Sequence, residues 1–460
     1  MVSRNGPGSP KASAAPRNLA FAKIITGLRE EYLASQDAIL DLGRFAIAQA
    51  SSLDAEEGAI RDLAARFLPE GSNDDVKRAF YQAASDFRVR IQEIVEDTSE
   101  LEGAAQAEIR DRRLEEAESK LKADLEPIRI GAYLPGLLFQ KFMAVQARKK
   151  RAPVMLESLL VMGVSNFENF VSKLATTSLA YNDGPMKSSN RKYSYAEVVE
   201  LGGATNEFRA RVIDDYVTEL MRGGLSEWLG FVATAVRMPE SAREQMHDEL
   251  VEVVQRRHVL VHNGGRVSAL YNRNSGARTV EVSIGERLGV NAGYLENAVE
   301  RLSLAGIVLA QGALSAVCAK GARGDEDINA TWGSVNEVLF EMMIARRWYC
   351  PGRSFELIKD MLPNSEYRTL VMVNSWYSTL KTSPQDAVLQ RARDWDVSSL
   401  HPKFKLARSC ILGEASVASG LAEELLASGE LSQMNIDTWP ILECVRVYRE
   451  EMGRRGEIER

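Results

Sequence analysis

Apolar residues recur at helical spacing through the first third of the chain. Within residues 19–90 they fall three and four positions apart, which predicts amphipathic helices. Residues 91–128 carry dense mixed charge and a thinner apolar thread, in which Leu114, Leu121 and Ile128 are seven residues apart. This spacing predicts a short coiled coil or, as the alternative, a solvated amphipathic helix.

A cluster of four cations at residues 148–151, followed by Pro153, marks the next boundary in the pattern. One interpretation is a solvated helix end, where cations interact favourably with the helix dipole; the other is a contact with an RNA backbone. The helical pattern resumes over about 154–180 and again over about 206–221. Residues 181–190, with a Gly-Pro pair and paired serines, predict the loop between them.

Three further elements are predicted between residues 239 and 319. A helix over about 240–262 follows Pro239, and the run Asn263-Gly264-Gly265 ends it, because glycine adopts the left-handed cap conformation at low cost. Residues 266–284 hold the clearest alternation of apolar and polar positions, which predicts a short β-hairpin. A last helix covers about 291–319.

Residues 320–330 contain Gly and Asp and predict a linker, after which the helical pattern is broken at short intervals. The breaks fall at Pro351, Pro363, Pro384, Pro402 and Pro440. Short helices with regular breaks predict a helical-repeat-like domain resembling tetratricopeptide folds, although the repeat signature itself is absent. We expect Trp376, Trp395 and Trp439 to form its core rather than a binding surface.

Composition narrows the class of protein. With 460 residues, 45% hydrophobic and 26% charged, the chain is expected to fold as a globular protein of about three domains. The net charge of −7 argues against a protein that coats nucleic acid through charge alone, and leaves a local basic groove open. Four widely separated cysteines without a CxxC pair exclude zinc ribbons and a disulfide scaffold.

No targeting or membrane segment is predicted. Residues 1–18 are rich in Gly, Pro, Ser, Ala and cations, and since no apolar core follows, they predict a flexible tail rather than a secretory signal. The uncharged run between Arg301 and Lys320 contains several polar residues and fits a buried helix better than a membrane span. We therefore expect a cytoplasmic protein.

The segment Met246–Gly265 carries unusual chemistry for a helix. Its apolar stripe runs to Val254, but the next stripe position is Arg257, a residue type almost never buried without a partner. Either a carboxylate pairs with Arg257, or this face lines an interface or a cleft. His258 and His262, two of only four histidines in the chain, are one turn apart and project from roughly the same side.

The run Arg257-His258-Val259-Leu260-Val261-His262 resembles the motif of the HEPN superfamily of all-helical ribonucleases and nucleotide-binding domains. That motif is an arginine, a polar residue after it, and a histidine a few positions later at the end of a long helix. The resemblance covers about residues 152–322 and is to bacterial HEPN proteins linked to toxin and abortive-infection systems. It implies a role as a toxin or an anti-phage defence effector.

The predicted protein is therefore mainly α, with a central HEPN helical bundle that carries a small β-hairpin insertion. We expect a flexible tail at 1–18, an N-terminal helical region with the coiled coil at 19–150, a HEPN-like nuclease domain at 151–322 and a C-terminal helical-repeat-like domain at 331–460.

The resemblance also implies a mechanism. HEPN ribonucleases act as dimers, without metal or other cofactor, so RNA is the expected substrate and a homodimer the expected assembly. His262 would transfer a proton, because a histidine pKa of about 6.5 lies near neutrality, and Arg257 would hold phosphate oxygens. His258, Asn263 and Arg256 are predicted to bind or orient the RNA. An antitoxin or a phage-derived trigger protein is the expected regulator.

Two alternatives stay open. The first is a HEPN domain without catalysis that serves as a nucleotide-binding or dimerisation module. The second is a metal-dependent hydrolase, since His258 and His262 have ligand spacing and His247 falls on the same side of a straight helix. The glutamate of an HExxH motif is missing, which weighs against the metal site.

Overall fold

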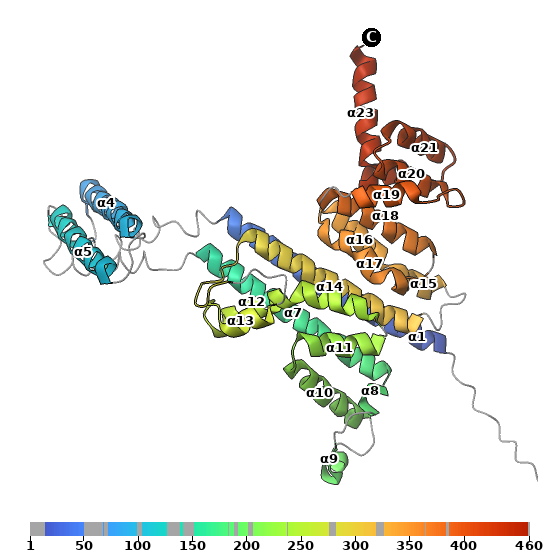
Figure 1. Cartoon of the computed structure of the whole chain (residues 1–460), viewed down its shortest axis with the longest axis horizontal. Coiled ribbons are helices and arrows are strands. Elements are labelled where there is room, and N and C mark those ends of the chain that lie inside the picture. The colour runs from blue at the N-terminus through green and yellow to red at the C-terminus, as the bar shows by residue number, and fades with distance from the viewer. Residues whose placement is uncertain are drawn as a thin grey trace, which may run out of the picture. The chain divides into compact units, whose positions relative to one another are not determined.

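The computed structural model describes most of the chain and shows it to be mainly helical (Figure 1). The described residues are 14–49, 68, 72–98, 104–126, 139–140, 151–182, 184–187, 192–200, 206–236, 238–275, 282–318, 326–363, 365–382 and 386–458. No strand occurs among them, so the predicted mainly α class is confirmed.

Contacts divide the chain into two units, residues 1–42 with 158–460, and residues 43–157. The smaller unit contains the paired helices α4 (Asp74–Thr98) and α5 (Ala104–Leu125). Leu121 is fully buried between them and Leu114 packs beside it, so the apolar thread of α5 faces a neighbouring helix. Ile128, the third residue of the predicted heptad, lies outside the described residues.

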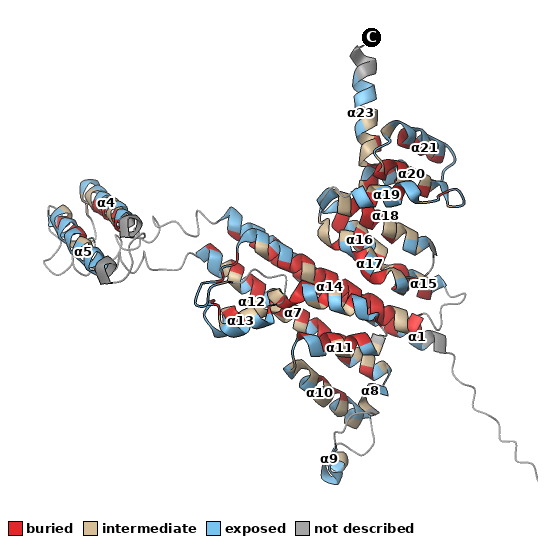
Figure 2. Cartoon of the chain, viewed as in Figure 1, coloured by how far each residue is buried: buried red, intermediate tan, exposed pale blue. Residues whose placement is uncertain are grey.

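The larger unit is built on a central bundle of long helices. These are residues 14–42 of α1 (Ala14–Ala48), residues 158–181 of α7 (Arg151–Tyr181), α11 (Leu225–Val236), α12 (Glu240–His262) and α14 (Ala292–Cys318). Four further helices of this unit are α8 (Gly184–Lys187), α9 (Tyr195–Glu200), α10 (Asn206–Arg222) and α13 (Ala269–Asn274). Figure 2 shows α14 buried along most of its length among these neighbours.

Residues 14–42 of helix α1 belong to this bundle, whereas the sequence predicted a separate N-terminal helical region at 19–150. Tyr32 explains the placement, because its ring stacks on Phe170 of α7 at 4.6 Å and its hydroxyl donates to the Leu302 carbonyl of α14 at 2.8 Å. The predicted tail at 1–18 is also too long, since α1 begins at Ala14 and Asn18 is buried. Residues 1–13 lie outside the described residues.

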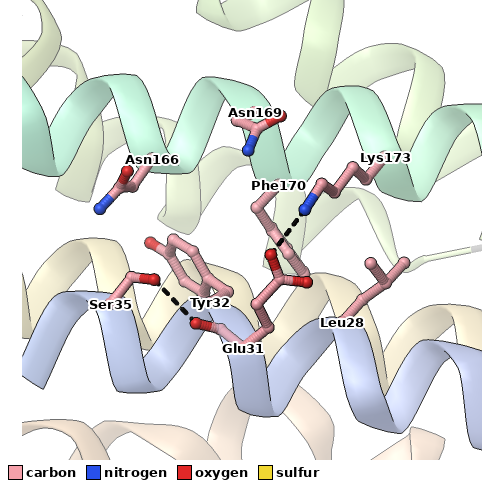
Figure 3. Close-up of a pocket in the computed structure, with 8 residues that line it drawn as sticks. All are labelled: Leu28, Glu31, Tyr32, Ser35, Asn166, Asn169, Phe170 and Lys173. Atoms are coloured by element: carbon pink, nitrogen blue, oxygen red, sulfur yellow. Dashed lines mark hydrogen bonds and ion pairs between the residues drawn. The ribbon is translucent and has the colours of Figure 1, made fainter.

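A small polar hollow lies between α1 and α7 (Figure 3). Lys173 of α7 donates to the Glu31 carboxylate of α1 at 2.7 Å, and Ser35 donates to the Glu31 carbonyl at 2.9 Å. Asn166 and Asn169 line the α7 side. The hollow measures about 30 Å³, which is room for one or two water molecules and too little for a substrate.

Two described helices, α7 and α14, are long and apolar enough to cross a membrane by length and composition alone. In the apolar window of α14, 83% of residues are buried inside the protein, and in that of α7 the share is 44%. Core helices of globular proteins have this character, so neither helix is a strong membrane signal.

The predicted β-hairpin at 266–284 is not confirmed. Residues 269–274 form helix α13 instead, started by Ser268, whose hydroxyl accepts from the Tyr271 backbone N–H at 3.2 Å. A single antiparallel bridge joins Arg266 to Arg287. Residues 276–281, which hold part of the alternating pattern, lie outside the described residues.

The C-terminal module consists mostly of short helices, and the first of them begins at Glu326, inside the linker predicted at 320–330. They are α15 (Glu326–Gly333), α16 (Val335–Ile344), α17 (Tyr349–Ile358), η2 (Lys359–Met361), α18 (Ser365–Thr382), α19 (Asp386–Asp394), α20 (Pro402–Ile411), α21 (Ala415–Ala427), α22 (Gln433–Thr438), η3 (Pro440–Leu442) and α23 (Glu443–Ile458). Helices α17 and α18 pair, as do α20 and α21. Trp376 and Trp439 are buried in one core and Trp395 packs against it, as expected.

One carboxylate fastens this module to the central bundle. Glu249 of α12 is almost fully buried and accepts a hydrogen bond from the Tyr349 hydroxyl of α17 at 2.5 Å. Arg301 and Arg353 both approach the same carboxylate, at 3.6 and 3.4 Å. Nearby, Arg347 pairs with Glu300 of α14 at 2.5 Å. Charged contacts thus hold the start of α17 on α12 and α14.

Candidate active site at the end of helix α12

Helix α12 ends at His262 because the backbone turns sharply after it. Asn263 is the C-cap, and its N–H donates to the Val259 carbonyl at 2.9 Å. Gly264 and Gly265 follow with φ angles of 59° and 81°, which favour glycine. The Asn-Gly-Gly stop expected from the sequence is therefore present, and it leaves the last turn of α12 open to solvent.

His258 and His262 form a pair on this last turn. Both side chains are exposed, and their ring centroids are 4.6 Å apart with the planes tilted by 47°. Partial burial, the neighbouring His262 and then the Arg257 charge lower the pKa of His258 below its usual 6.5. The His258 imidazole is therefore neutral at neutral pH and able to accept a proton.

Arg257 points away from solvent, toward α7. It donates to the Glu168 carboxylate at 3.3 Å, and both side chains are about three-quarters buried. Burial raises the pKa of Glu168, and the Arg257 charge partly opposes that rise. The Nε of Arg257 is buried with no hydrogen-bond partner among the described residues. The sequence left two interpretations of Arg257 open, a carboxylate partner or a face that lines an interface or a cleft, and the structure shows the carboxylate partner.

Arg256 lies in a different network on the other side of the helix. Its guanidinium donates to Glu252 at 2.7 Å and to the Gly289 carbonyl at 2.8 Å, and it lies 3.8 Å over the ring of Tyr294. The hydroxyls of Tyr271 and Tyr294 donate to the same Glu252 carboxylate at 2.8 and 2.6 Å. Arg256 therefore holds the loop before α14 against α12, and its guanidinium, which was predicted to orient RNA, makes its contacts inside the protein.

The five residues predicted for the site thus separate into three places. His258, His262 and Asn263 share the exposed helix end, Arg257 lies beneath it, and Arg256 lies in the Glu252 network. Glu168 and Glu252 were not predicted from the sequence as part of the site. A carboxylate near Arg257 was foreseeable from the interrupted apolar stripe, but its place 89 residues earlier was not.

The histidines do not assemble into a metal site in the part of the chain that the structure describes. His247 lies nearly three turns before His258, and its Nε2 is 2.9 Å from the Ser226 hydroxyl of α11. No group of three His, Cys, Asp or Glu side chains among the described residues is placed to hold a metal ion. The observed pair offers at most two nitrogen ligands.

Comparisons with known proteins leave the family unassigned. No protein-family model, no curated protein and no solved structure matches this chain. The resemblance to HEPN proteins therefore stays a prediction based on the motif and its position at a helix end.

Proposed function

We propose that the protein is a metal-independent endoribonuclease whose reactive groups are the imidazoles of His258 and His262. The observation that carries the proposal is the contact of two exposed histidine rings at the open end of α12. Histidine is the side chain best suited to move protons near neutral pH, and RNA cleavage needs two proton transfers. The finer assignment of the fold as a HEPN bundle belongs to the same proposal.

The reaction that suits this pair is attack by the ribose 2′-hydroxyl on the adjacent phosphorus. A bond forms between the 2′-oxygen and phosphorus, and the bond from phosphorus to the 5′-oxygen breaks. A neutral imidazole takes the 2′ proton, and a protonated imidazole gives a proton to the leaving 5′-oxygen. The lowered pKa of His258 favours the neutral form there, and His262 keeps the proton-transfer role inferred from the motif.

Arg257 supplies positive charge close to the histidine pair, since its charge helps to lower the pKa of His258. Its pairing with Glu168 at 3.3 Å leaves other donors of the planar guanidinium for phosphate oxygens. Asn263 is exposed at the helix end and is proposed to orient the phosphate or ribose. Because the net charge is −7, RNA binding has to come from a local cleft, which a homodimer of two such helix ends would enlarge.

The biological role proposed with this activity is that of a cytoplasmic toxin or anti-phage defence effector. An antitoxin or a phage-derived trigger protein would regulate it. Expression of wild type and His262→Ala in bacteria, with and without phage challenge, tests this role. Growth inhibition and new RNA ends are expected from the wild type alone.

A second candidate is a HEPN domain that binds nucleotide or dimerises without catalysis. The Arg257–Glu168 pair favours it, because a largely buried arginine paired with a carboxylate is common as a structural feature. In that case nucleotide would bind, yet no RNA would be cut at any protein concentration.

The decisive experiment is cleavage of a mixed RNA pool by the purified full chain in the presence of a chelator. We expect 2′,3′-cyclic phosphate ends, with the rate reduced at least about 100-fold in His262→Ala and in His258→Ala. His401→Ala is the matched control, because His401 is an exposed histidine in the C-terminal module. Full cleavage by His262→Ala, or loss of activity with the chelator, would refute the proposal.

A further inference from the structure

The C-terminal module contains a cavity of about 440 Å³, which is the size range of small-molecule sites. It lies where the end of α16, the end of α18 and the α22–α23 corner meet. Its walls combine apolar side chains with three cations, Arg346, Lys381 and Arg446. Trp348 is partly exposed in the wall and meets Tyr377 edge-on with ring centroids 6.0 Å apart.

Arg346 has an unusual backbone for its residue type. Among the described residues it is the one non-glycine with positive φ, at 58°. It follows the C-cap of α16, where its N–H donates to the Met343 carbonyl at 3.0 Å and the next N–H donates to the Met342 carbonyl at 2.9 Å. This pair of bonds defines a Schellman motif, in which the Arg346 position is normally glycine.

Two other helices of the same module end in the same motif, so their C′ residues can be compared with Arg346. Gly413 and Gly429 follow the C-caps of α20 and α21 with φ angles of 75° and 76°. Each makes the same two backbone bonds, as at Gly429, whose N–H donates to Leu426 at 3.2 Å while the next N–H donates to Leu425 at 3.0 Å. Three equivalent positions thus carry Gly, Gly and Arg, and the arginine lines the cavity described above.

The charge of Arg346 is also uncompensated. Within the described part of the chain its guanidinium has no hydrogen-bond or ion-pair partner, and the residue is exposed. Lys381 is different, because Glu443 neutralises it and that contact lowers the pKa of Glu443. Arg446 donates to the carbonyls of Ile436 and Trp439 and is anchored there.

We propose that this cavity binds a small anion that carries a planar ring, of the size and chemistry of a nucleoside monophosphate. Arg346 receives the phosphate, since an unpaired guanidinium binds phosphate oxygens through two parallel bonds. Trp348 supplies a surface for the ring. Asp437 and Thr438, which line the cavity from α22, offer an acceptor and a hydroxyl for the sugar or the base. The site is separate from the histidine pair and does not depend on the ribonuclease proposal.

The test is a binding titration by calorimetry on the full chain with the four ribonucleoside monophosphates, inorganic phosphate and the free nucleosides. At least one nucleotide is expected to bind about tenfold or more tightly than phosphate or its own nucleoside. Trp348→Leu and Arg346→Gly are each expected to weaken binding by about tenfold or more. Arg393→Gln, an equal charge loss at an exposed position outside the cavity, should bind like wild type.

Arg346→Gly keeps the test free of a folding artefact, because glycine suits the backbone at this position. Its melting temperature is expected to equal or exceed that of the wild type while its affinity falls. The proposal fails if no nucleotide binds below millimolar concentration, if phosphate alone binds as well as the nucleotide, or if Arg346→Gly retains full affinity. Preferential binding of an acidic peptide over every nucleotide would also overturn it.

Discussion

The contact between α1 and α14 depends on a glycine, and Gly306→Ala tests that dependence. An alanine in the middle of a helix normally stabilises it by about 1 kcal/mol relative to glycine. At Gly306, however, the added Cβ would lie 2.2 Å from Cε1 and 2.6 Å from Cδ1 of Tyr32. Carbon atoms in contact are ordinarily about 3.5–4.0 Å apart, so the ring would have to move by more than about 1 Å.

Tyr32 has little freedom to move. Its hydroxyl donates to the Leu302 carbonyl at 2.8 Å and its ring stacks on Phe170 at 4.6 Å. Overfilling a core costs about 1–3 kcal/mol, and loss of the hydrogen bond costs about 1 kcal/mol more. After the helix-propensity gain is subtracted, Gly306→Ala should lower the free energy of unfolding by about 1–3 kcal/mol.

Urea denaturation followed by far-ultraviolet circular dichroism measures this difference. The matched control is Gly27→Ala in α1, where an added Cβ meets nothing within 4 Å, and we expect it to be neutral or to stabilise by up to about 1 kcal/mol. In a Tyr32→Leu background the penalty of Gly306→Ala should shrink. If Gly306→Ala alone is as stable as the wild type, the argument for a steric contact at this crossing is wrong.

Four further outcomes are expected. The His258 pKa, followed by NMR of ring-labelled histidine, should lie below 6.5 and rise in His262→Asn, since His262 and burial both disfavour the charged form. Because the pKa of His258 is lower in the folded protein than in the unfolded chain, the unfolded chain binds the proton first, and the free energy of unfolding should fall as pH drops below about 6.5. His258→Gln should reduce that fall. An unchanged dependence of stability on pH in this variant would contradict the lowered pKa of His258. Glu249→Ala should lower the free energy of unfolding by about 2–4 kcal/mol, because it leaves two partly exposed arginines and a tyrosine hydroxyl without their shared acceptor. A loss below about 1 kcal/mol would show that Glu249 does not fasten the C-terminal module to the central bundle. Arg256→Ala should speed hydrogen exchange in the loop at 282–291 and lower stability by about 1–3 kcal/mol, whereas a purely RNA-binding arginine would change neither.

The helices of this protein were predictable where a local signal decides them. The stop after His262 is one case, because Asn263-Gly264-Gly265 accommodates the positive φ angles of the turn whatever surrounds it. The segment at 266–284 is the opposite case. Its alternation predicted strands, but residues 269–274 form helix α13. The Ser268 cap that starts α13 is a local signal, whereas the buried Tyr271 depends on its contact with Glu252 of α12, which the local pattern does not encode.

The candidate site was also predictable where local spacing decides it and not where a distant partner does. The spacing of His258 and His262 sufficed to place both rings on one side of a helix, and their contact follows from helical geometry. The role of Arg257 required knowledge of which carboxylate lies opposite, and Glu168 comes from another helix. The contacts of Arg256 were not foreseen for the same reason, since Tyr294 and Gly289 are brought to it by the fold of the chain after α12.

The attachment of the C-terminal module at Glu249 fixes the rotational register of α12. His258 follows Glu249 by nine residues, and at about 100° per residue the two side chains leave the helix on opposite sides. His262 lies within about 40° of His258 by the same arithmetic. A turn of the helix large enough to hide the histidines would pull Glu249 away from Tyr349 and Arg353. A protein that binds over the histidine side of α12, in contrast, can associate and dissociate without disturbing the contacts of Glu249.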